Sequence, residues 1–300
     1  MRELISIQAL VDLIDDPDER VSRQVEDELL KHGVKLIPTL EEILEESLNH
    51  PEKAGRINSL LSELRHQKVA DSLRKWKASD EKSLLEGLYF VTKYQFPDLT
   101  KEEFMHPFKE LKEAVWLEIS PKHTSFEIIT IFNKIFFEHF QFTSSAKHSS
   151  TPFDVLINTV FATKEGTDIT IGLIYSIVAQ SLSLPIYGVV SSQTNIPFLL
   201  AHLDKNDLLS LLNWGVHQNG VLFYLDIAQK GAMLKPNELQ TVFDSEQIKQ
   251  CRSLFEPSPN SVLVAHYLRA FISTCEQNAQ FRYKVKHLQS LLDIMECKLT

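Results

Sequence analysis

One uncharged segment constrains the fold of this chain more than any other feature. No Asp, Glu, Lys or Arg occurs between Asp168 and Asp204. The segment exceeds the ~20 residues that a membrane-spanning helix needs. It also contains Pro185, Gly188 and Pro197, many Ser, Thr, Gln and Asn residues, and a hydrophobic period that changes midway. We therefore expect it to form the buried core of a globular domain rather than a membrane span.

Start and stop signals predict two buried helices in this region. Thr151 precedes a proline and an acid follows, which is the usual order of a helix N-terminus. We expect this first helix to end at Gly166. Thr167 or Asp168 then caps a second helix. Pro185 ends it, because the residue before a proline disfavours helical dihedral angles.

Three short runs rich in β-branched and aromatic residues predict strands at 186–190, 198–203 and 221–226. The polar segment 141–150 is expected to be a loop, and 236–250 is expected to be a helix. Together with the buried helices, these strands predict an α+β fold. It is mostly helical, with a core of helices packed on a small antiparallel sheet.

Helices are also expected at both ends of the chain. Residues 1–78 predict short amphipathic helices followed by a long linking helix, and the pattern of the short ones resembles one HEAT-like repeat. Residues 251–300 predict a helical hairpin that resembles one tetratricopeptide-type pair. A further helix should start at Ser79, and a Phe-rich one should span about 125–140. We predict three units, at 1–78, 79–250 and 251–300.

The charge balance excludes some classes of partner. The formal net charge is -9, which argues against nucleic acid and anionic membranes. Residues 1–50 hold five Lys or Arg and thirteen Asp or Glu, so nearly all of the net charge lies there. These helices either cover the core or form a docking surface with an acidic rim. We expect a protein partner of unknown identity, and the sequence leaves the oligomeric state open.

The cysteines indicate a reducing compartment. Cys251, Cys275 and Cys297 are odd in number and form no CxxC motif. The N-terminus lacks the long apolar segment of a secretion signal. We therefore expect free thiols and a cytoplasmic location.

The order of several segments resembles the SirB1 family, whose core is transglutaminase-like and related to papain-type cysteine enzymes. The resemblance covers roughly residues 56–250. It rests on LLEGLYFVTKYQFPDLT at 84–100, a Phe-rich helix, LINTVFATKEGTDITIGLIYSIVAQSLSLPIYGVV from Leu156, and FYLDIAQKG from Phe223. It implies a transglutaminase-like (papain-like) core. It also implies a site made of a cysteine at the start of the buried helix, a histidine on a neighbouring strand and an orienting aspartate.

This chain departs from that implied site. The buried helix starts with Asp168 and Thr170 in place of a cysteine, and Pro197 stands where the resemblance places the histidine. Asp226 remains at the position of the orienting acid. His202 is an alternative base, but its odd separation from Pro197 predicts that the two side chains point to opposite faces of the strand. These positions mark a vestigial site with no predicted catalytic residue.

Three functional hypotheses remain open. The first is a non-catalytic transglutaminase-like protein, a pseudoenzyme that binds or regulates a protein. The second is a hydrolase or acyltransferase with a rebuilt site that uses His202 and Asp226. The third is a subunit of a larger assembly, which an exposed apolar patch would support. The sequence predicts no cofactor and no metal site, because the histidines are dispersed and no nucleotide-binding loop occurs.

Overall fold

The structure is a computed structural model, and it describes residues 7, 9–47, 49–144, 151–190, 198–204, 220–235, 238–239 and 255–297. Its N-terminal part includes α2 (Glu19–Lys31), α3 (Ile37–Glu46) and the first half of α4 (Pro51–Ala78). The Asp18 side chain caps α2 by accepting from the Arg20 N–H. The positive φ of Gly33, 67°, turns the chain between α2 and α3.

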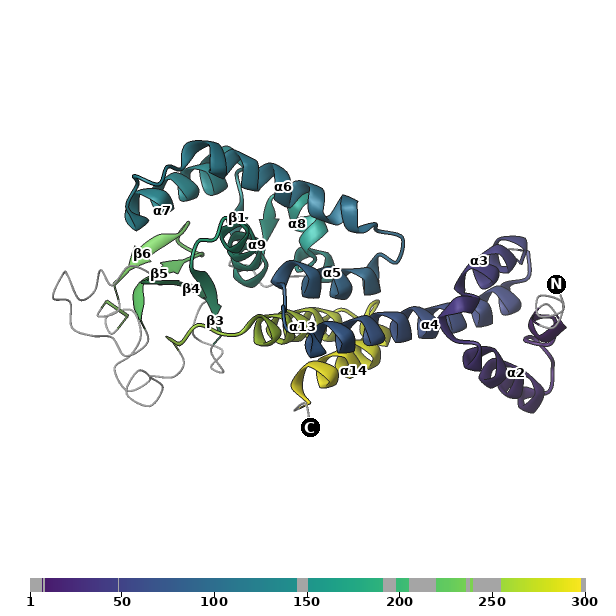
Figure 1. Cartoon of the computed structure of the whole chain (residues 1–300). Coiled ribbons are helices and arrows are strands. Elements are labelled where there is room, and N and C mark those ends of the chain that lie inside the picture. Colours follow the sequence, from purple (N-terminus) through teal and green to yellow (C-terminus); the bar gives the residue numbers. More distant parts are fainter. Residues whose placement is uncertain are drawn as a thin grey trace.

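Helix α4 runs from α2 and α3 to the rest of the molecule (Figure 1). It contributes residues to two hydrophobic clusters. Its residues from Ile57 to Leu64 pack with α2 and α3, whereas those from Val69 to Trp76 belong to the main core. The division between these clusters therefore falls inside the single long helix that the sequence predicts.

Three helices follow α4 and cover the core: α5 (Leu84–Gln95), α6 (Lys101–Glu118) and α7 (Ser125–Asn133). Capping boxes at Thr100 and Thr124 start α6 and α7. The prediction that a helix starts at Ser79 is wrong. The Ser79 hydroxyl donates to the Trp76 carbonyl at 2.6 Å and so closes α4. The Phe-rich helix also does not stay regular, because a π-helical turn occupies Lys134–His139.

The centre of the fold contains α8 (Ile157–Thr163) and α9 (Asp168–Ser181). The predicted helix start at Thr151 opens only a 3₁₀ turn, Pro152–Asp154, because Leu156 is extended with φ -73° and ψ 122°. Helix α8 ends before Gly166, at the left-handed Lys164. Part of the expected 141–150 loop forms β1 (Thr143–Ser144), which pairs in parallel with β2 (Glu165–Gly166).

The main sheet is antiparallel, with β3 (Ile186–Val189), β4 (Leu199–Leu203), β5 (Val221–Asp226) and β6 (Ala232–Leu234) side by side in that order. The predicted strands are confirmed, and β6 is an addition. Leu200 and Leu225 share the main core with α9, while Ala201 and Tyr224 belong to a smaller cluster. The predicted helix at 236–250 lies almost wholly outside the described residues.

The chain ends in a helical hairpin of α13 (Asn260–Gln277) and α14 (Val285–Glu296). Helix α13 contacts α5 and α9, and α14 contacts α4. Figure 1 shows the hairpin alongside α4, with the sheet at the far end of the molecule from α2 and α3. The hairpin shares the main hydrophobic cluster with α9. None of the described helices has the length and apolar character of a membrane span.

Candidate functional site

The start of α9 forms the centre of the candidate site. Strand β2 leads directly into Thr167, whose hydroxyl caps α9 by accepting from the Thr170 N–H at 3.3 Å. Thr170 is fully buried, and its hydroxyl donates to the Val155 carbonyl at 2.9 Å. Thr170 is therefore bound into the core and does not present a nucleophile to solvent.

Asp168 occupies the first turn of α9 and is partly buried. The Ser144 hydroxyl, at the end of β1, donates to Asp168 Oδ1. Burial raises the pKa of Asp168, and the charge of Asp226 raises it further. The structure thus brings two of the predicted site residues, Asp168 and Asp226, into electrostatic contact.

Asp226 ends β5, opposite Leu199 on β4. Its side chain accepts from the Gln229 N–H at 3.3 Å, and its carbonyl accepts from the Gly231 N–H at 2.8 Å. These two bonds fix the turn between β5 and β6. Asp226 therefore stabilises the turn after β5 and also acts electrostatically on Asp168.

His202 lies elsewhere on the sheet. It is 3% exposed and stacks on Phe223, with ring centroids 4.7 Å apart. The register pairs His202 with Phe223, three positions before Asp226 on β5. Because side chains alternate between the two faces, His202 and Asp226 point to opposite sides of the sheet. The sheet does not assemble them into one site.

The described cysteines lie outside the site. Cys275 is in the buried part of α13, where burial raises the pKa of its thiol to about 11. Cys297 follows α14 and is exposed. Pro197 and Cys251 lie outside the described residues. Neither described thiol belongs to α9 or to the sheet.

Sequence reasoning missed three neighbours of the site. Ser144 lies in the segment 141–150 that the sequence predicts as a loop, and no local sequence pattern indicates its hydrogen bond to Asp168. Phe198, just before β4, packs so closely on Gly172 of α9 that a Cβ there would meet its ring at 2.5 Å. His266 of α13 stacks on Phe198 from another side, and burial lowers the pKa of His266 to about 4.

Two features elsewhere resemble binding sites. Within the described part of the chain, one group has the donor types and spacing of a metal site: Glu63 and His66 on α4 with His287 on α14. The Glu-x-x-His spacing of the first two was the available sequence signal. A pocket between α5 and α6 is lined by Glu86, Tyr89 and other residues, none from α9 or the sheet.

Comparison with known proteins gives one match. The sequence model described as the transglutaminase-like superfamily matches residues 102–269, from α6 into α13. No curated protein and no solved structure matches significantly. The matched region contains α9, the main sheet and the Asp168–Asp226 pair. This chain belongs to the transglutaminase-like superfamily.

Proposed function

We propose that this chain is a non-catalytic, SirB1-type member of the superfamily that works by binding and regulating another protein. One observation carries the proposal. The helix start that the resemblance assigns to a reactive thiol holds Asp168, whose pKa is raised by burial and by Asp226.

The electrostatics support the loss of thiol chemistry. A catalytic cysteine needs its pKa lowered, which a helix N-terminus and a neighbouring cation provide. Here the charge of Asp226 acts on the helix start, and Pro197 stands where the resemblance places the histidine whose cation would compensate it. A thiolate at position 168 would be repelled by Asp226, so the site would disfavour the reactive form even with sulfur restored.

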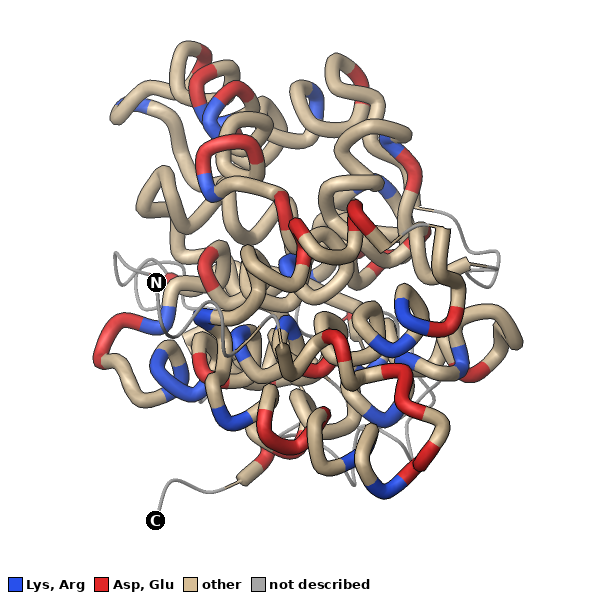
Figure 2. The backbone as a smooth tube through the Cα atoms, turned by 90° about the vertical axis from the view of Figure 1, so that its right-hand side faces the viewer, with Lys and Arg blue, Asp and Glu red and all other residues tan. Residues whose placement is uncertain are grey.

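The N-terminal helices are the proposed docking surface, as a HEAT-like unit whose partner carries a basic segment. Helix α3 exposes Glu42, Glu45 and Glu46, and none of them forms an ion pair with a described residue. Figure 2 views the molecule from the side that carries these helices and shows acidic and basic residues interspersed over it. Opposite charge on a partner would speed and orient its association with α3.

We also propose that the C-terminal hairpin is a tetratricopeptide-like pair and that the protein is cytoplasmic. The location follows from the odd number and the spacing of the cysteines in the sequence, which are typical of a reducing compartment.

Restoring the thiol tests the non-catalytic part. The variant Asp168→Cys, with Cys251 and Cys297 changed to Ser, is alkylated with iodoacetamide across a pH series. We expect the new thiol to titrate at or above the ordinary value of about 8.5. A thiol that titrates below about 7 would show that the site still supports a thiolate, against the proposal.

Capture of a partner tests the docking surface. Full-length protein is crosslinked in a native extract, alongside Glu42→Gln/Glu45→Gln/Glu46→Gln. The control, Glu102→Gln/Glu118→Gln, removes exposed acids from α6 instead. A partner captured by the wild type and the control, but lost by the α3 variant, supports the proposal. Equal capture by all three contradicts it.

A second candidate function, a subunit of a larger assembly, has one observation in its favour. Trp116 and Leu117, near the end of α6, are 63% and 73% exposed. Large exposed apolar side chains often mark protein contacts. Light scattering of the wild type and of Trp116→Ser/Leu117→Ser tests it. An oligomer that dissociates in the variant supports a subunit role, and a monomer in both cases opposes self-assembly.

A further inference from the structure

Two helices that are distant in the sequence meet at a cluster of metal-type donors. Glu63 and His66 are three residues apart on α4 and therefore share one helix face. His287, in the first turns of α14, lies against that face, and its Nε2 is 3.1 Å from Glu63 Oε2. One donor atom from each of the three residues lies within 4.8 Å of the others.

His66 is the unexplained member of this cluster. The residue is only 8% exposed, and both of its ring nitrogens are inaccessible to solvent. No hydrogen bond of ordinary geometry joins either nitrogen to a described residue, and its Nδ1 is 3.9 Å from Glu63 Oε1. A buried polar group that makes no hydrogen bond weakens the fold, and a bound ligand would satisfy the ring of His66.

His287 is already oriented as a metal-binding histidine is. Its Nε2 faces Glu63, and its Nδ1 is 3.3 Å from the Tyr94 hydroxyl on α5. Metal-bound histidines usually make such a second hydrogen bond, which fixes the ring and its tautomer. Tyr94 is therefore an outer partner of the cluster and not itself a donor.

We propose that Glu63, His66 and His287 bind one divalent transition-metal ion of the Zn²⁺ class. Two imidazoles and one carboxylate form a three-ligand Zn²⁺ set, which leaves a fourth position open to water or another ligand. A histidine binds a metal ion through a nitrogen of its neutral ring.

The three donors can reach the geometry of a Zn²⁺ site by movement of their side chains. Donors around tetrahedral Zn²⁺ at about 2.0–2.1 Å are separated by about 3.4 Å. The widest separation here must therefore close by an ångström or more. The rings of His66 and His287 stack at 4.5 Å with an interplanar angle of 17°, so binding requires at least one ring to turn.

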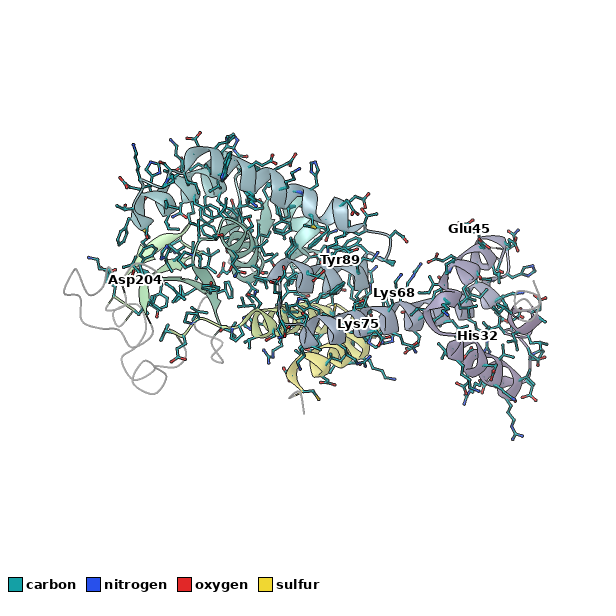
Figure 3. All side chains as sticks on the ribbon, in the orientation of Figure 1. His32, Glu45, Lys68, Lys75, Tyr89 and Asp204 are labelled. Carbon is teal, nitrogen blue, oxygen red and sulfur yellow. The ribbon has the colours of Figure 1, made fainter. Side chains whose placement is uncertain are left out.

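The ion would connect two parts of the molecule. Leu64 belongs to the N-terminal cluster and Val69 to the main core, so the donors lie where α4 passes between them. Lys68 marks this stretch of α4 in Figure 3. A metal ion bound by His287 of α14 and by Glu63 and His66 of α4 would link the C-terminal hairpin to the helix that carries the N-terminal unit.

Metal titration of the chelator-treated full-length protein tests the inference. We expect one Zn²⁺ ion per chain by calorimetry and, with Co²⁺, the visible absorption of a tetrahedral site. His287→Gln and Glu63→Gln should each weaken Zn²⁺ binding by about 100-fold or more, and Tyr94→Phe by about tenfold. Glu63 is partly exposed, so its variant should fold even if a histidine variant does not.

The control is His106→Gln, which removes an exposed histidine 3.8 Å from Glu110 on α6. It should leave Zn²⁺ affinity unchanged. The inference is overturned if the wild type binds no Zn²⁺ at about 100 µM. It is also overturned if folded Glu63→Gln and Tyr94→Phe both bind as the wild type does, since the ion would then lie elsewhere.

Discussion

Asp168, at the start of α9, and Asp226, at the end of β5, lie close enough for the charge of Asp226 to raise the pKa of Asp168. Two residues more than fifty positions apart in the sequence thus place like charges near each other in the fold. Such pairs destabilise the ionised state, and carboxyl groups with perturbed pKa values cluster at functional sites.

We predict that Asp168→Asn stabilises the protein at pH 7. Because the folded pKa is raised, the native state takes up a proton more readily than the unfolded chain, so ionised Asp168 weakens the fold at neutral pH. The asparagine retains an acceptor for Ser144. Urea denaturation should show a gain at pH 7 that shrinks as the pH falls through the raised pKa of Asp168 and is lost below the ordinary value of 3.8. A loss of stability at pH 7 would instead show that the charge supports the helix start.

His266 should make stability depend on pH in the opposite direction. Burial lowers the pKa of His266 to about 4 from its ordinary 6.5, so the unfolded chain binds the proton first. Stability should therefore fall as the pH drops from about 6.5 to 4, by up to about 1.4 kcal/mol per unit. His266→Gln should flatten this slope in thermal melts. An unchanged slope in the variant would exclude His266 as its source.

The half-buried amide of Asn133 connects α7 to α9 and to the turn before β6, and removing it should be costly. Asn133, at the end of α7, accepts from the Tyr175 hydroxyl at 3.0 Å and donates to the Gly231 carbonyl at 2.8 Å. Asn133→Ala leaves both groups without these bonds, so we expect a loss of about 2–3 kcal/mol. The double variant Asn133→Ala/Tyr175→Phe should recover part of it. Additive losses in the cycle would contradict coupling between the two side chains.

We predict that Lys77 stabilises the C-terminal turn of α14. Its ammonium donates to the Ile294 carbonyl at 2.7 Å and to the Cys297 carbonyl, where the helix leaves acceptors unsatisfied. Lys77→Met should speed hydrogen exchange in the last turn of α14. The control is Lys75→Met, an exposed position on the same helix that is labelled in Figure 3. Equal exchange in the two variants would assign the stability of α14 to packing alone.

The sequence predicted the elements that local chemistry specifies. Thr167 and Pro185 mark the two ends of α9, because a cap and a proline each act on the backbone within about one turn. The β-branched and aromatic run at 221–226 favours a strand without reference to its partner strands. The prediction at Ser79 was wrong because a serine can cap the start of the next helix or, as here, hydrogen-bond to the end of the preceding one. Thr151 does cap the turn that follows it, but that turn stops at the extended Leu156 and does not become a helix.

The sites were harder to predict because they depend on distant contacts. The resemblance placed Asp168 and Asp226 around one vestigial site, but the bond from Ser144 needs the β1–β2 pairing. Glu63 and His287 are 224 positions apart and meet only because α14 lies on α4. Dispersed histidines therefore do not exclude a metal site.

The most direct test of the central claim is turnover by the purified full-length chain. Amine incorporation into glutamine peptides and hydrolysis of peptide and amide substrates are measured beside an active transglutaminase. We predict no turnover above background for the wild type, because the start of α9 carries Asp168 and a buried Thr170 in place of a thiol. Turnover that Asp168→Asn or Asp226→Asn abolishes would contradict the account.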